Sequence, residues 1–114
     1  MKKGSIVLIP FPFTNLRGIK IRPAVVLSMN VLDVTICFIT SELKWKTEYD
    51  ISILPSYKNG LKVPSLIRIE KIATIDSTLV LGEMGELSNI EIAELNKGLI
   101  KLFQLQDIEM QSKV

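Results

Sequence analysis

The chain has 114 residues, 47% of them apolar, and this length fits one folded domain over residues 1–114, with a core of about 4–105 and a polar tail of 106–114. One cysteine and no histidine exclude an internal disulfide and a Cys/His metal cluster, and no Asp/Glu cluster suggests magnesium, so we expect no metal and no other cofactor.

The net charge of +2 is unevenly distributed, because the first 22 residues hold five basic side chains and no acid. This distribution suits a polyanion at one face, or simply a solvated N-terminal region. The lone cysteine favours a cytoplasmic setting, and no apolar segment is long enough for a signal peptide or a membrane span.

The first half of the chain predicts three strands separated by polar loops. A strand over residues 5–13 ends at two prolines. Residues 23–28 form a second strand whose continuous apolar run indicates burial on both faces. β-Branched residues predict a third strand over 33–40, in which Cys37 is expected to be a small buried hydrophobe. A charged loop then carries the only tryptophan, Trp45.

The second half continues with short extended segments. We expect a short strand over residues 49–54, followed by a turn over 55–63 that contains an Asn-Gly pair. Residues 65–75 then form an extended segment, and residues 78–84 are expected to pair with it.

A helix is predicted at the C-terminal end. Ser88 and Glu91 have the spacing of a capping box, and Leu87 and Ile92 that of the hydrophobic staple around it. Apolar side chains then fall on one stripe: Ile92, Leu95, Leu99, Leu102 and Phe103. Gly98 weakens the helix without breaking this pattern.

Five or six short strands followed by one amphipathic helix predict a mainly β (α+β) fold, a small β-barrel with the helix packed on it. Strands and helices do not alternate, and no glycine-rich phosphate loop opens a helix. A Rossmann-type nucleotide-binding sheet is therefore not expected.

Arg68 and Glu70 are the first candidates for chemistry. They share one face of the predicted strand because side chains alternate, whereas Ile67, Ile69 and Lys71 face the other way. Arg68 could bind a phosphate through two N–H groups, and Glu70 could take a proton from a hydroxyl. From the spacing alone, an ordinary surface ion pair between the two side chains is the simpler interpretation.

Three further positions have both a functional and an ordinary interpretation. Arg22 precedes a proline that holds it in an extended conformation, so it is a phosphate ligand or a surface arginine. Thr40 and Ser41 carry hydroxyls where a strand ends, which can bind phosphate oxygens or form a local turn. Trp45 lies between two lysines and can stack on a nucleobase or fold over the edge of the barrel.

Taken together, these segments resemble the MazF/PemK family of toxins over about residues 4–105. The resemblance is carried by Gly4-Ser-Ile-Val-Leu-Ile-Pro-Phe-Pro-Phe-Thr14, Ile21-Arg-Pro-Ala-Val-Val-Leu-Ser28, Cys37-Phe-Ile-Thr-Ser41 and Ile67-Arg-Ile-Glu-Lys-Ile-Ala-Thr-Ile-Asp76. It implies an SH3-like or CcdB-like barrel with a C-terminal helix, which forms a homodimer. It also implies a metal-independent endoribonuclease that cleaves single-stranded RNA at short sequences, and a cognate antitoxin whose disordered segment wraps the toxin.

The resemblance also implies site residues. Arg22 and Thr40 match the catalytic arginine and threonine of the family, and Arg68 and Glu70 match an Arg-x-Asp pair that some members use as acid and base. Ser41 matches an adjacent active-site serine in some members. The remaining expected substrate-binding residues are Arg17, Lys20 and Trp45. The chain departs from the family in a shorter first loop, which lacks a His/Glu-Gln segment, and in a glutamate where one branch has aspartate.

The mechanism that these residues suggest is transesterification. Glu70 would deprotonate the 2′-hydroxyl, both arginines would stabilise the charged phosphorane, and Thr40 would donate a hydrogen bond to it. Two alternatives remain. CcdB-like gyrase poisons share the barrel, bind a protein and cut nothing, but depend on a Trp-Gly-Ile-like end that this chain lacks. A degenerate family member would bind RNA or an antitoxin without cleavage.

Overall fold

The computed structural model describes residues 1–11 and 20–106. The elements in chain order are β1 (Ser5–Phe11), β2 (Lys20–Met29), β3 (Asp33–Thr40), the 3₁₀ turn η1 (Leu43–Trp45), β4 (Ile51–Ile53), β5 (Ser65–Asp76), the 3₁₀ turn η2 (Ser77–Leu79), β6 (Gly82–Glu86) and α1 (Asn89–Phe103). Most of the first loop, with Arg17, and most of the predicted tail lie outside the described residues.

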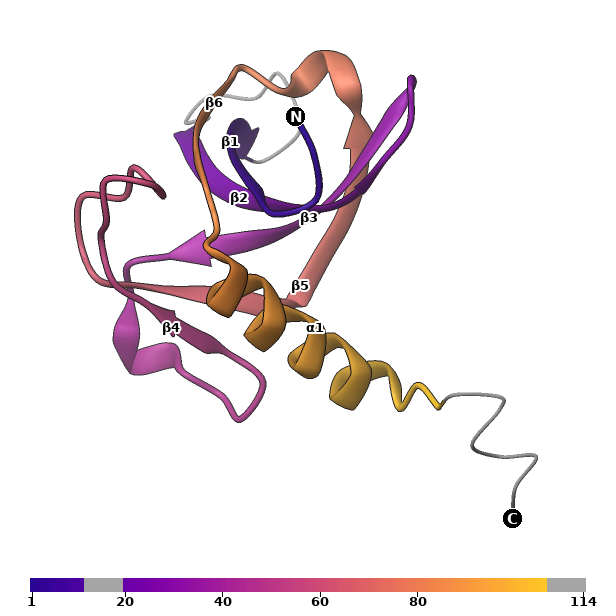
Figure 1. Ribbon diagram of the computed structural model, residues 1–114. Helices are drawn as coiled ribbons and strands as arrows, with labels where there is room; N and C mark the ends of the chain where they lie inside the picture. The colour runs from indigo at the N-terminus through magenta and orange to yellow at the C-terminus, as the bar shows by residue number, and fades with distance from the viewer. Residues whose placement is uncertain (12–19, 107–114) are drawn as a thin grey trace.

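The six strands form one antiparallel sheet in the order β4-β5-β3-β2-β1-β6. The sheet curls strongly, and α1 lies beside β5 and β4 at its open side (Figure 1). The prediction of a mainly β, barrel-like fold with a C-terminal helix is confirmed. β3 has the predicted bounds, while β2 begins earlier than expected.

The pairing predicted for residues 78–84 is wrong. β6 pairs with β1, with Val7 opposite Glu83, and not with β5. β3 pairs along most of one edge of β5, and β4 pairs with Ser65–Ile67 on the other edge. Asp76 also ends β5, because its carboxylate accepts hydrogen bonds from Thr78 and caps η2, which turns the chain away.

Two apolar cores lie on opposite faces of the curled sheet. Alternate residues of the same strand enter different cores, so Val25 belongs to one while Ala24 and Val26 belong to the other. All three are fully buried, which confirms the prediction that β2 is covered on both faces. Cys37 is also buried, and burial raises the pKa of its thiol to about 12 because the thiolate is poorly solvated there. It is therefore a packing residue, as predicted.

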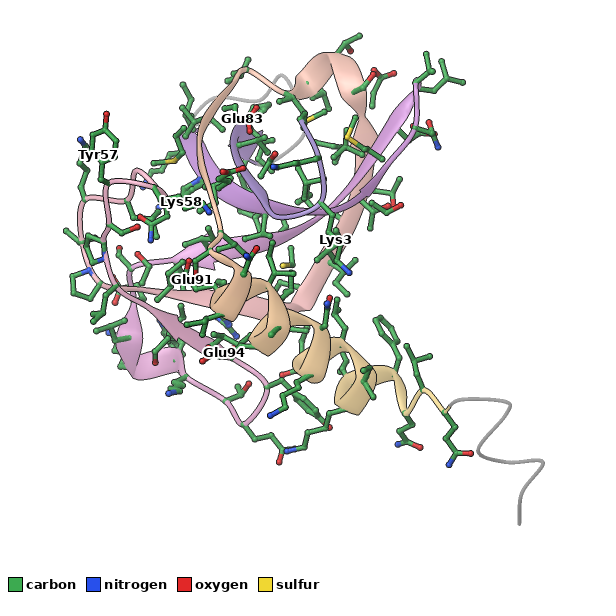
Figure 2. The ribbon with its side chains drawn as sticks, in the orientation of Figure 1. Lys3, Tyr57, Lys58, Glu83, Glu91 and Glu94 are labelled. Atoms are coloured by element: carbon green, nitrogen blue, oxygen red, sulfur yellow. The ribbon has the colours of Figure 1, made fainter. Side chains whose placement is uncertain are left out.

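The loop between β4 and β5 closes the barrel against β6. Asn59 organises this loop from a fully buried position. Its Oδ1 accepts from the backbone N–H groups of Ser56 and Leu61 at 3.0 and 2.9 Å, and its Nδ2 donates to the carbonyl of Leu54 at 2.8 Å. Tyr57, in contrast, points away from the protein at the outer end of the loop (Figure 2).

Two glycines allow this close approach. The carbonyl of Lys58 accepts from the N–H of Glu86 at 3.0 Å, so the loop and β6 touch through their backbones. A Cβ at Gly85 would lie 2.4 Å from the carbonyl of Asn59, and one at Gly60 would lie 2.2 Å from the carbonyl of Met84. Gly60 also has φ +72°, which other residues rarely adopt.

α1 packs along one stripe, as predicted, except at its end. The capping box is formed: Ser88 Oγ accepts from the N–H of Glu91, and Oε1 of Glu91 accepts from the N–H of Ser88. Leu95 is fully buried, and the stripe continues through Ile92, Leu99 and Leu102. Phe103 was predicted to join it but is 56% exposed, because the last turn of α1 extends beyond the sheet (Figure 1).

Gly98 has a packing role that its helix propensity does not indicate. A Cβ at this position would lie 2.3 Å from Cδ1 of Ile69, so the glycine lets α1 approach β5 closely. Among the described residues, no helix is long and apolar enough to cross a membrane.

Candidate active site

An open pocket of about 550 Å³ lies where β3 ends and β5 bends. It brings together five of the predicted site residues, which come from β2, the end of β3 and β5. Among the described residues, the lining consists of Phe11, Arg22, Phe38, Ile39, Thr40, Ser41, Glu42, Arg68, Glu70, Lys71 and Ile72.

A bulge in β5 shapes this pocket. Cys37 of β3 is opposite Ile72, but the next residue, Phe38, is opposite Arg68, so residues 69–71 have no partner on β3. Such a bulge bends a strand and changes the direction of its side chains. Lys71 was predicted to face away from Glu70, yet both are exposed and line the pocket. The simple alternation of side chains along a strand therefore did not predict that Lys71 belongs to the site.

Arg68 is paired with Asp50 and not with Glu70. Its Nε lies 3.0 Å from Oδ2 and 3.2 Å from Oδ1 of Asp50, whose side chain is 0% exposed. The surface ion pair considered for Arg68 and Glu70 is not among the ion pairs of the described residues. The sequence offered no signal for Asp50, because it follows a charged loop and precedes a strand of only three residues.

Glu70 is held from the same loop. The hydroxyl of Thr47 donates to Oε1 of Glu70 at 3.1 Å, and the backbone N–H of Thr47 donates to Oδ2 of Asp50 at 2.9 Å. The loop before β4 thus contacts both Arg68 and Glu70 of β5. Thr47 is a second residue that the sequence did not identify.

Arg22, Thr40 and Ser41 also line the pocket. Arg22 is exposed on β2 and lies opposite Ile9 of β1. Oγ1 of Thr40 accepts from the N–H of Glu42 at 3.1 Å, so the local turn considered for this residue is formed. A hydroxyl that accepts one hydrogen bond can still donate its own proton, so Thr40 can also serve a phosphate oxygen.

Two of the other predicted substrate-binding residues, Lys20 and Trp45, are not in the pocket lining. Lys20 is exposed at the start of β2, and Trp45 is 58% exposed in η1, with Nζ of Lys44 5.5 Å from its ring centroid. Arg17 lies outside the described residues. The pocket holds instead an aromatic pair that was not predicted: Phe11 and Phe38, edge to face with centroids 5.2 Å apart.

The chemical groups of the pocket suit a phosphodiester. Two guanidinium groups and the ammonium of Lys71 supply positive charge, the hydroxyls supply neutral donors, and Glu70 supplies a carboxylate. Within residues 1–11 and 20–106, no group of three or more histidines, cysteines or acids could hold a metal ion.

Known structures share this fold. The toxin MazF-mt6 of Mycobacterium tuberculosis is 20% identical, with a TM-score of 0.73, over 90% of this chain and 99% of that one. An endoribonuclease from a mycobacterial species, solved with its cognate antitoxin, is 15% identical with a TM-score of 0.74, covering 94% of this chain and 98% of that one. MazF of Deinococcus radiodurans is 20% identical with a TM-score of 0.72, covering 92% and 97% respectively.

Two comparisons use the sequence alone. The comparison with curated proteins finds no match. The sequence model of the family described as "PemK-like, MazF-like toxin of type II toxin-antitoxin system" matches residues 2–103. Since this match covers nearly the whole chain, the protein belongs to the family of PemK-like, MazF-like toxins of type II toxin–antitoxin systems.

Proposed function

We propose that this toxin is a metal-independent endoribonuclease that cleaves single-stranded RNA at short specific sequences. The observation that supports this best is one pocket that holds two arginines, a carboxylate and a threonine hydroxyl from three different strands. In the proposed reaction the 2′-hydroxyl attacks its adjacent 3′-phosphate, and the bond from phosphorus to the 5′-oxygen breaks. The products are a 2′,3′-cyclic phosphate and a 5′-hydroxyl. DNA lacks the nucleophile and is not cleaved.

Glu70 is the proposed general base. Its Oε1 accepts from the hydroxyl of Thr47, which fixes the carboxylate and leaves Oε2 for the 2′-hydroxyl. Glutamate, whose side chain is longer than that of the aspartate in one family branch, keeps the carboxylate that this role requires.

Arg22 and Arg68 are the proposed stabilisers of the phosphorane. They come from different strands of one pocket, so they can bind different phosphate oxygens. Thr40 and Ser41 donate further hydrogen bonds. Donors that are already in place lower the barrier because they need little reorganisation when charge develops.

Lys71 is the proposed donor of the proton to the leaving 5′-oxygen. A guanidinium cannot be deprotonated in proteins, whereas a lysine ammonium readily takes part in proton transfer. Lys71 lines the same pocket as Glu70. Base and acid thus come from neighbouring residues of the bulge, and the pocket contains a better proton donor than either arginine.

Substrate binding extends beyond the pocket in this proposal. Lys20, Trp45 and Arg17 contribute charge and stacking along the RNA strand, as the sequence predicts. Phe11, which is 45% exposed at the pocket, is positioned to stack on a base next to the scissile phosphate.

Protein partners follow from the family. MazF of D. radiodurans has been solved with MazE, and the mycobacterial endoribonuclease with its cognate antitoxin. We propose that this chain likewise binds a cognate antitoxin and forms a homodimer. An RNA substrate would place its action in the cytoplasm.

The test is cleavage of a long unstructured RNA and its DNA counterpart in EDTA, with the product ends mapped. Wild type is compared with Arg22→Ala and with Lys97→Ala, a charge removed from the exposed face of α1. We expect discrete RNA cuts with 5′-hydroxyl ends, and a rate about 10²–10³-fold lower for Arg22→Ala only. A folded wild-type protein that cuts no RNA would overturn the proposal. Topoisomerase inhibition would then indicate a gyrase poison, and RNA binding alone a degenerate member.

A further inference from the structure

Asp50 is the only acid that is buried among the described residues. A carboxylate out of contact with water is unfavourable unless charges and hydrogen-bond donors surround it. Asp50 has both, because Nε of Arg68 lies 3.0 Å from Oδ2 and the N–H of Thr47 donates to the same oxygen. The burial of this charge therefore depends on the geometry of its two partners.

The contacts on each side of Asp50 lead into the pocket. Arg68 is 19% exposed and lines the pocket, and an arginine held through Nε has four further N–H donors on its terminal nitrogens. On the other side, the N–H of Asp50 donates to the carbonyl of Thr47 at 3.2 Å, which closes a turn over residues 47–50. The hydroxyl of Thr47 then reaches Glu70.

We propose that Asp50 is a positioning residue that orients both Arg68 and Glu70. It acts on Arg68 directly, through the buried ion pair, and on Glu70 indirectly, through the turn that places the Thr47 hydroxyl. One buried charge thereby couples a phosphate-binding group that precedes the β5 bulge to a base within the bulge. The catalytic consequence rests on the proposed nuclease function, but the positioning itself does not.

A purely structural ion pair would stabilise the fold and leave catalysis otherwise unaltered. The two roles differ in what happens when Arg68 is absent. If Asp50 works by orienting Arg68, then removing the Asp50 charge lowers the cleavage rate only slightly once Arg68 is already alanine. The small loss that remains is the effect of Asp50 on Glu70. If Asp50 is only structural, the two losses combine independently.

The first measurement needs no RNA. Exchange of the Arg68 Nε–H proton with water is followed by NMR in wild type, in Asp50→Asn and in Asp33→Asn, which removes an exposed acid at the far end of the sheet. We expect exchange to be at least about tenfold faster in Asp50→Asn only, because a charge-assisted hydrogen bond to a buried acceptor is lost. Unchanged exchange in a folded Asp50→Asn protein would refute the positioning role.

The second measurement is cleavage kinetics. We expect Asp50→Asn to lower kcat about 10–100-fold with a smaller change in KM, and Asp33→Asn to behave as wild type. In the Arg68→Ala background the same change should lower kcat less than about fivefold. Full multiplicative losses in the double variant would show that Asp50 does not act through Arg68.

Thr47 keeps the proposal testable if Asp50→Asn does not fold. Thr47→Val removes the hydroxyl that reaches Glu70, whereas Thr47→Ser retains it. A lower kcat in the valine variant with near wild-type kcat in the serine variant supports the indirect action of Asp50 on Glu70 through Thr47. Equal kcat values in the two variants refute that indirect action. If the wild type itself cuts no RNA, the nuclease proposal fails while the exchange measurement still decides whether Asp50 orients Arg68.

Discussion

The hydroxyl of Thr47 donates to Oε1 of Glu70 at 3.1 Å, across 23 positions of sequence. A residue of an irregular loop thus holds the carboxylate on β5 that we assign as base. Arg68, two residues earlier on the same strand, contacts the same loop through Asp50.

Glu70→Gln is expected to lower the cleavage rate about 10²–10⁴-fold, because the amide accepts a hydrogen bond from Thr47 but cannot take a proton. Glu70→Asp should retain part of the activity, since it keeps the carboxylate and loses only reach. Single-turnover rates, with circular dichroism as a control of folding, measure this. Wild-type cleavage by Glu70→Gln would exclude Glu70 as the base.

Lys71→Met is expected to slow cleavage of ordinary RNA about 10²-fold or more, because the leaving 5′-oxygen loses its proton donor. The matched substrate is an RNA in which sulfur replaces that oxygen, since a thiolate leaves without protonation. On this substrate wild type and Lys71→Met should react at similar rates. An equal defect on both substrates would mean that Lys71 binds the phosphate and donates no proton.

Gly85→Ala is expected to destabilise the protein by about 1–3 kcal/mol, because the new Cβ would lie 2.4 Å from the backbone of Asn59 and neither chain can easily move. Gly82 is the matched control on the same strand, since a Cβ there meets nothing within 4 Å. Gly82→Ala should stay within about 0.5 kcal/mol of wild type in urea unfolding. Equal stability of the two variants would contradict the close contact of the loop with β6.

Thr78→Val is expected to raise the pKa of Asp76 toward its ordinary value of 3.8, since the Thr78 hydroxyl is the main cause of the lowering and its backbone N–H the lesser one. A carboxyl group whose pKa is lowered in the folded state stabilises the fold at pH values above the ordinary carboxyl pKa. This stabilisation is lost as the pH falls through the pKa of the folded state. The stability difference between wild type and Thr78→Val should therefore be greatest near neutral pH and shrink in acid. Carboxyl titration by NMR and urea unfolding at several pH values measure both effects.

Local patterns in the sequence were sufficient for several elements. The β-branched run predicted β3 to its end residues, and the apolar run predicted that β2 is covered on both faces. The Ser88–Glu91 spacing predicted the capping box of α1. These features depend on neighbours within about four residues, so the sequence alone contains the information that specifies them.

The candidate site was predictable only in part. Arg22, Thr40, Ser41, Arg68 and Glu70 were named from the sequence, and all five line one pocket. Lys71 was assigned to the wrong face, because a bulge interrupts the alternation on which that assignment depended. Arg17 lies outside the described residues, and Lys20 and Trp45 are not in the pocket lining.

Only the tertiary structure decided the long-range contacts. The sequence by itself determined the strands, the helix with its cap, and the residue types that suit a phosphodiester, because periodicity and capping are local. The pairing of β6 with β1, the burial of Asp50 against Arg68 and the contact of Gly85 with Asn59 join residues 18 to 81 positions apart. Such contacts depend on how the sheet curls and on which strand edges remain open, and no local pattern encodes either.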